Sequence, residues 1–219
     1  MRYRLFLLAL TVFVVISVCS SPPSQGVVIL CAGDSITDSE YPRDLERLLA
    51  QDGVRSRVLN YGRKGNTSGE YLRFLEGRRA SLAAERPDFV LIQLGTNDVR
   101  LDGDKTEAPA FARNLRTIIG IFREFPGRRG GPPGILLASI PPVPETVGFP
   151  FGPASRERIT REINPLVRDI AREERLVFVD NYALFAGAPE LLPDVHPSRE
   201  GYRRLARNWR DALAPLLEK

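Results

Sequence analysis

Four short segments of the sequence carry side chains that could take part in acyl transfer. The segments are Gly33-Asp34-Ser35-Ile36-Thr37, Asn60-Tyr61-Gly62-Arg63-Lys64-Gly65, Gly95-Thr96-Asn97-Asp98 and Asp194-Val195-His196. Histidine occurs once in the 219 residues, so a reaction that needs an imidazole must use His196. Imidazole titrates near neutral pH, which suits it to act as a general base. Each segment alone is typical of a turn or a helix cap, but the four together point to a catalytic site.

Acyl transfer needs a nucleophile, a base, a group that orients the base, and donors for the developing oxyanion. Ser35 supplies a hydroxyl, His196 supplies the base, and Asp194 can reach the imidazole from two residues away. The expected oxyanion donors are the backbone N–H groups of Ser35 and Gly65 and the side-chain amide of Asn97. Glycine at position 65 would let the backbone approach the substrate closely.

Short apolar runs alternate with helix-periodic segments along the chain. The predicted strands are 27–32, 57–61, 89–94, 135–140 and 176–180, and the predicted helices are 42–51, 68–85, 109–125, 156–174 and 199–217. We expect a kink or break at Pro165, because proline cannot donate a backbone hydrogen bond within a helix. Strands that are apolar on both faces indicate a parallel sheet covered by helices on both sides. The sequence therefore predicts one three-layer α/β/α domain over residues 26–219, with the four segments at the strand ends, where such sheets bind ligands.

Residues 1–25 have the plan of a secretory signal peptide. Arg2 and Arg4 precede an apolar run over residues 5–18, and a Ser/Pro-rich stretch breaks this run. The run is short for a membrane-spanning helix, which needs about 20 apolar residues. We therefore expect an exported protein, with an uncleaved N-terminal anchor or lipidation of Cys19 as alternatives. Apart from this segment, no contact with a membrane is expected.

The charge balance does not favour a nucleic-acid partner. The net charge is +4, with 31 Lys and Arg against 27 Asp and Glu, and two of the arginines belong to the leader segment. Arg203, Arg207 and Arg210 of the last predicted helix are interpreted as a solvated face rather than a phosphate-binding stripe. No segment interleaves basic and aromatic residues as in proteins that bind single strands.

A metal or cofactor is not expected either. One histidine and two cysteines exclude a zinc finger and an iron–sulfur cluster held by four cysteines. Asp34 and Asp98 are predicted to hydrogen-bond the loops around the site, and with Asp38 they form no more than a weak candidate metal cluster. Cys31, in the first predicted strand, is interpreted as a buried structural thiol rather than a rival nucleophile.

Together the four segments resemble the motifs of the GDSL, or SGNH, hydrolase family, over about residues 27–213. The serine, glycine, asparagine and histidine that name the family match Ser35, Gly65, Asn97 and His196, with Gly62 as an alternative for the glycine. This resemblance implies a flavodoxin-like sandwich with sheet order 2-1-3-4-5 and ester hydrolysis through an acyl-enzyme. The serine lies outside a Gly-x-Ser-x-Gly elbow, which argues against the α/β-hydrolase fold.

The orienting aspartate departs from the family pattern. The family usually places it three residues before the histidine, and Pro193 occupies that position here. A branch that acts on sugar acetyl esters has the shorter Asp-x-His spacing, which matches Asp194. Asp180, at the end of the fifth predicted strand, and a backbone carbonyl are the alternatives.

The resulting functional hypothesis is an exported serine esterase that removes short acyl groups, such as acetyl, from a small ester or from carbohydrate. A lysophospholipase or thioesterase that acts on longer acyl chains is an alternative, because the proline-rich loop 141–153 carries Phe149 and Phe151. An acyltransferase that uses a sugar hydroxyl, or a catalytically idle carbohydrate- or envelope-binding module on the same scaffold, would belong to other functional classes.

Overall fold

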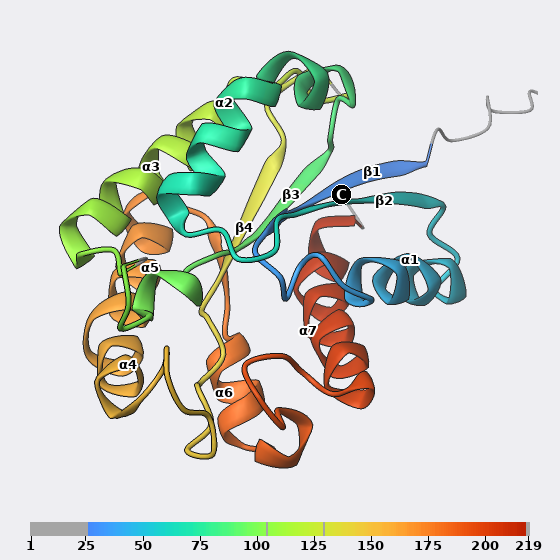
Figure 1. The fold of residues 1–219 in the computed structure, drawn as a ribbon. Helices are drawn as coiled ribbons and strands as arrows, with labels where there is room; N and C mark the ends of the chain where they lie inside the picture. Colours follow the sequence, from blue (N-terminus) through green and yellow to red (C-terminus); the bar gives the residue numbers. More distant parts are fainter. Residues whose placement is uncertain (1–25, 104, 129, 218–219) are drawn as a thin grey trace, which may run out of the picture.

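The computed structural model describes residues 26–103, 105–128 and 130–217, in which five parallel strands form one sheet (Figure 1). The strands are β1 (Val27–Gly33), β2 (Ser56–Gly62), β3 (Phe89–Gln93), β4 (Gly134–Ala138) and β5 (Val177–Val179). Their order is β2-β1-β3-β4-β5, and every neighbouring pair is parallel. The predicted fold class and strand order are therefore confirmed. The order reverses between β1 and β3, and ligands bind beyond the carboxyl ends of strands at such a reversal.

Helices cover both faces of the sheet (Figure 1). One face packs against α1 (Tyr41–Gln51) and α7 (Arg199–Leu217), and the other packs against α2 (Ser68–Ala84), α3 (Ala108–Arg123) and α5 (Asn164–Glu173). Two short helices, α4 (Pro153–Arg158) and α6 (Asn181–Ala186), complete the architecture together with 3₁₀ turns at Asn97–Val99 and Pro189–Leu191. None of the helices described here is long and apolar enough to span a bilayer.

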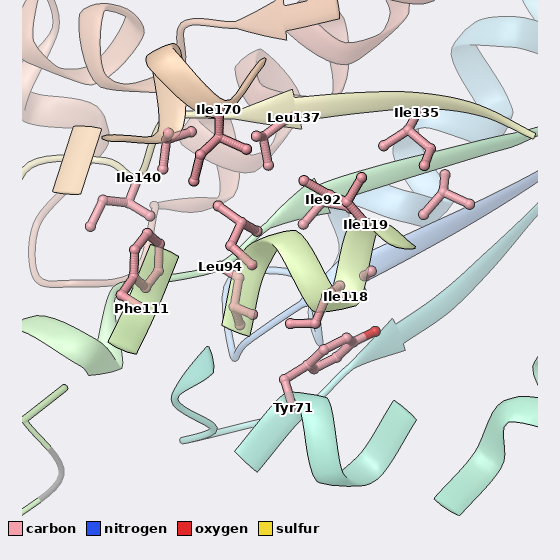
Figure 2. Packing of buried hydrophobic residues seen from close by; sticks show 14 of the residues in the cluster. Tyr71, Ile92, Leu94, Phe111, Ile118, Ile119, Ile135, Leu137, Ile140 and Ile170 are labelled. Carbon is pink, nitrogen blue, oxygen red and sulfur yellow. The ribbon is translucent and has the colours of Figure 1, made fainter. Parts of the chain in front are cut away.

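Two apolar layers, one on each side of the sheet, make up the core. In β1, Leu30 and Ala32 join the layer under α2 and α3, whereas Ile29 and Cys31 join the layer under α1 and α7. Figure 2 shows the first of these layers, with Phe111, Ile118 and Ile119 of α3 packed over the strands. This two-sided burial is the reason why the strands read as unbroken apolar runs rather than as alternating patterns.

The structure differs from the predicted elements in two places. The single helix predicted over 156–174 is divided into α4, a π-helical turn at Ile159–Ile163, and α5, which has Pro165 in its first turn. Proline fits there because the first N–H groups of a helix have no intrahelical partner. Helix α6 was not predicted, although Asp180 caps it by accepting a hydrogen bond from the Ala183 N–H.

Arg203, Arg207 and Arg210 of α7 are paired with carboxylates on the surface. Arg203 and Arg207 both contact Glu200, and Arg210 contacts Asp52 and Asp211. This pairing agrees with the interpretation of a solvated helix face. The predictions of a signal peptide and of lipidation at Cys19 concern residues 1–25, which lie outside the described residues.

Two fully buried carboxylates hold the loops at the strand ends. Asp98 accepts hydrogen bonds from the backbone N–H (2.9 Å) and the hydroxyl (2.6 Å) of Ser68, which joins the loop after β3 to the first turn of α2. Asp34 accepts a hydrogen bond from the Ile36 N–H at 3.0 Å and so fixes the turn after β1. The predicted role of both residues in these loops is therefore confirmed. Burial raises the pKa of both carboxyl groups, to about 6 for Asp34 even though the Ile36 hydrogen bond opposes this rise.

The raised pKa of Asp34 predicts a pH-dependent stability. Its carboxyl group has a pKa of about 6 in the folded protein and of 3.8 in a solvated chain. The stabilisation of the folded state that this shift provides is therefore complete below pH 3.8 and is lost as the pH rises through 6. This loss amounts to at most about 3 kcal/mol. Asp34→Asn keeps an acceptor for the Ile36 N–H and removes the titration. Urea unfolding at several pH values between about 4 and 7 should show the variant gaining stability relative to the wild type as the pH rises. A difference that does not change with pH would contradict this account.

Candidate active site

Ser35 and His196 meet beyond the carboxyl end of β1. Ser35 lies in the turn that follows β1, and its Oγ is 2.9 Å from Nε2 of His196, which lies just before α7. The loop of His196 is held at the start of α7, where the Ser198 N–H donates to the Leu191 carbonyl and the Ser198 Oγ accepts from the Gly201 N–H. Two side chains 161 residues apart in sequence are thereby placed within hydrogen-bonding distance.

Asp194 orients the imidazole from the other side. Its Oδ1 lies 3.1 Å from Nδ1 of His196 and also accepts the backbone N–H of His196. A proton on Nδ1 leaves the Nε2 lone pair directed at the Ser35 hydroxyl, as a general base requires. The side chains of His196 and Asp194 are 45% and 62% exposed, so water screens their interaction, and the main effect of Asp194 is on the orientation of the ring.

The alternative aspartate, Asp180, is engaged elsewhere. Its Oδ1 accepts the Ala183 N–H at 3.0 Å and the Ser139 hydroxyl at 3.0 Å, and its Oδ2 contacts Arg168. It therefore caps α6 and fixes the end of β4, and the geometry favours Asp194 as the partner of His196.

Three hydrogen-bond donors are placed for an oxyanion. Within the described residues, the backbone N–H groups of Ser35 and Gly65 make no hydrogen bond, so both can donate to a ligand. The Asn97 side chain donates one amide hydrogen to the Asn66 carbonyl at 3.0 Å and keeps the second. Gly65 has a φ of 76°, in the left-handed region where a side chain would be strained.

Gly62, the alternative glycine, has a different task. Its N–H donates to Oδ1 of Asn60 at 2.9 Å and is not available to a substrate. A Cβ at this position would lie 2.1 Å from the Asp38 backbone nitrogen, so the residue allows the loops after β1 and β2 to pack closely. The geometry thus favours Gly65 as the oxyanion donor.

A cleft of about 700 Å³ contains these groups. Its lining comprises Ser35, Asp38, Ser39, Lys64, Gly65, Thr96, Asn97, Arg100, Pro150, Phe151, Val195, His196 and Tyr202. The proline-rich loop 141–153 contributes Pro150 and Phe151 to this lining. Sequence reasoning missed Arg100 and Tyr202, because neither belongs to a motif and only the folded chain brings them to the cleft.

The other reactive groups considered from the sequence do not compete with Ser35. The Cys31 thiol is buried in β1, and burial raises its pKa to about 12, so it carries no thiolate near neutral pH. Among the described residues, no three His, Cys, Asp or Glu side chains are grouped so that they could hold a metal ion.

Comparisons with known proteins agree with this geometry. Residues 31–204 match the model of the GDSL-like Lipase/Acylhydrolase family. An acetylxylan esterase from Xylanibacter ruminicola is 26% identical over 85% of this chain, and the match spans 43% of that relative's length. Esterase TesA from Pseudomonas aeruginosa is 28% identical, over 86% of this chain and 89% of the relative.

A solved structure extends the comparison to three dimensions. An acetylxylan esterase from Geobacillus stearothermophilus superposes with a TM-score of 0.68 at 25% identity, and the match covers 86% of this chain and 94% of the other. The segment that matches the family model, residues 31–204, includes Ser35, Gly65, Asn97 and His196. The chain therefore belongs to the GDSL-like lipase/acylhydrolase family.

Proposed function

We propose that this protein is an exported serine esterase that removes short acyl groups, above all acetyl, from carbohydrate through an acyl-enzyme. The observation that carries the catalytic part of this proposal is the 2.9 Å contact between Ser35 Oγ and His196 Nε2, in a cleft that also holds three oxyanion donors. Export rests on the pattern of residues 1–25, with its basic start and apolar run.

Acylation follows from the positions of these groups. His196 Nε2 takes the hydroxyl proton as Ser35 Oγ attacks the carbonyl carbon of the ester. The carbonyl oxygen becomes an oxyanion, which accepts hydrogen bonds from the Ser35 and Gly65 N–H groups and the Asn97 amide. As the tetrahedral intermediate collapses, His196 passes the proton to the leaving alcohol oxygen, and the acyl group remains on Ser35.

Deacylation repeats the sequence with water as the nucleophile. His196 removes a proton from a water molecule that attacks the acyl carbon, and the same donors stabilise the second oxyanion. Collapse of this intermediate returns the proton to Ser35 Oγ and releases the carboxylic acid.

The charged side chains in the cleft lining support a polar substrate with a small acyl group. Asp38, Lys64 and Arg100 all line the cleft, and a long acyl chain against them would remove water without replacing its hydrogen bonds. A carbohydrate alcohol would supply such bonds through its hydroxyl groups. The acetylxylan esterases that resemble this chain act on a substrate of this class, as their names state.

An idle binding module is disfavoured on geometric grounds. That hypothesis rested on the irregular spacing of the aspartate and histidine, yet Asp194 Oδ1 lies 3.1 Å from His196 Nδ1. A binding module would not require the nucleophile, the base and the orienting carboxylate to be aligned in this way.

The catalytic roles predict a graded loss of activity. Ser35→Ala and His196→Ala should each lower kcat for p-nitrophenyl acetate by at least about 10³-fold, because each removes a group that reacts directly. Asp194→Ala should lower it less, by roughly 10- to 100-fold, because this carboxylate is exposed and mainly orients the ring. Initial rates measured on variants with unchanged circular dichroism test this order. Wild-type activity in Ser35→Ala would overturn the assignment of the nucleophile.

Acyl-chain length provides an independent test of the substrate class. Acetyl, butyryl and octanoyl esters of the same phenol share one leaving group, so their kcat/KM values report on the acyl side alone. A steep fall beyond acetyl is expected, because longer chains would meet the charged lining of the cleft. A maximum at octanoyl would instead favour the lysophospholipase or thioesterase hypothesis.

A further inference from the structure

Two charged side chains that line the catalytic cleft, Asp38 and Lys64, have no partner among the described residues. Asp38 follows β1, Lys64 follows β2, and both line the same cavity as Ser35. Within the described residues, neither the Asp38 carboxylate nor the Lys64 ammonium group makes an ion pair or a hydrogen bond. Together they offer an acceptor and a donor to the hydroxyl groups of a ligand.

An apolar surface also lines the cleft, next to the base. It consists of Pro150 and Phe151 from the loop before α4, together with Val195, which directly precedes His196. Phe151 is only 9% exposed and packs into the core under α2 and α3, so this surface is firmly held. Because His196 protonates the leaving oxygen, the alcohol part of the ester must lie on the side of the cleft where Val195 is found.

Two exposed apolar residues directly adjoin the cleft lining in sequence, since Leu101 follows Arg100 and Phe149 precedes Pro150. Leu101 and Phe149 are the two exposed large apolar side chains of the described residues, at 39% and 79% exposure. Their segments are joined, because the Leu101 N–H donates to the carbonyl of Pro150, the residue after Phe149, at 2.7 Å. The end of the Leu101 side chain lies beside Gly152 of the same loop. A second hydrogen bond, from the Phe151 N–H to the Gly148 carbonyl at 3.0 Å, closes the turn that presents Phe149.

We propose that Phe149, on the loop that Leu101 holds through Pro150, is a stacking platform for the sugar ring next to the one that carries the acyl group. This inference rests on the proposed function and extends it, because it makes the substrate an acylated oligosaccharide or polysaccharide rather than a monosaccharide. The acylated ring occupies the cleft, within reach of its charged side chains and its apolar surface, and the neighbouring ring lies on the exposed aromatic ring.

The chemistry of sugars fits these surfaces better than that of a lipid. A pyranose ring has faces of C–H groups, which pack on aromatic and aliphatic side chains, and an edge of hydroxyl groups, which can bond to Asp38 and Lys64. An acyl chain in the same place would bury both charges without a partner, which is costly. An exposed aromatic next to a cleft that combines apolar and charged side chains therefore suits a sugar polymer.

The test compares substrates of different length on variants of one exposed residue. Phe149→Ala removes the ring, Phe149→Leu keeps apolar area without a ring, and Phe149→Tyr keeps the ring. Since the side chain is 79% exposed, all three variants should fold as the wild type does. The substrates are p-nitrophenyl acetate, peracetylated xylose and acetylated xylotetraose, with p-nitrophenyl octanoate as the probe for an acyl chain.

We expect Phe149→Ala and Phe149→Leu to raise KM for acetylated xylotetraose by roughly 3- to 10-fold. Their kcat/KM values for p-nitrophenyl acetate and peracetylated xylose should stay unchanged, and Phe149→Tyr should behave as the wild type on all substrates. Equal effects on the tetraose and the monosaccharide, or no effect on either, would overturn the platform. A selective loss with p-nitrophenyl octanoate would assign Phe149 to an acyl chain instead.

Failure of the proposed function itself would be visible in the wild type. A protein that hydrolyses p-nitrophenyl acetate but deacetylates neither sugar would contradict carbohydrate as the substrate class and, with it, the platform. A wild type that deacetylates both sugars, with a tetraose KM that does not depend on Phe149, would contradict the platform alone.

Discussion

The hydrogen bond between Ser35 and His196 joins two loops that are 161 residues apart, and the arrangement of the whole sheet serves this contact. Because β1 lies between β2 and β3 in the sheet, the turn that carries Ser35 lies between the exits of these two strands. The donors of Gly65 and Asn97 arrive from these two exits. The chain then passes through β4 and β5 and returns along α7, whose start holds His196 against Ser35.

Buried polar contacts keep these loops in register with one another. Asp98 fixes the β3 exit to α2, and Asn97 in turn holds the β2 exit through the Asn66 carbonyl. Asp34 fixes the turn of the nucleophile from within the core. Such contacts are costly to leave unmade, which explains why the catalytic groups are preorganised even though His196 and Asp194 are exposed to water.

Much of the fold could be predicted from the sequence, because strands buried on both faces consist mostly of apolar residues. Runs that are apolar on both faces occur in parallel strands between helix layers, and the prediction of the helix over 199–217 coincides with α7. Helix α6 escaped prediction because its six residues are too few to show a period. Pro165 indicated an irregularity in the helix predicted over 156–174, but not that a π-helical turn at Ile159–Ile163 would precede it.

The residues of the site also fall into those that could be predicted from the sequence and those that could not. Ser35, Asn97 and His196 could be proposed from their motifs, whereas the choices between Gly65 and Gly62 and between Asp194 and Asp180 depend on which atoms are already engaged. The places of Arg100, Tyr202 and Phe149 depend on tertiary contacts that no spacing encodes.

The proposed mechanism depends on the activation of Ser35 as a nucleophile by His196. The most direct measurement is intact-mass spectrometry after treatment with a fluorophosphonate, followed by peptide mapping of the adduct. A single adduct on Ser35 is expected, and it should form rapidly in the wild type and in Asp34→Asn. In His196→Ala the same adduct should form at least about 10²-fold more slowly. An adduct on Ser39, which also lines the cleft, or an unmodified protein that still hydrolyses esters, would contradict this mechanism.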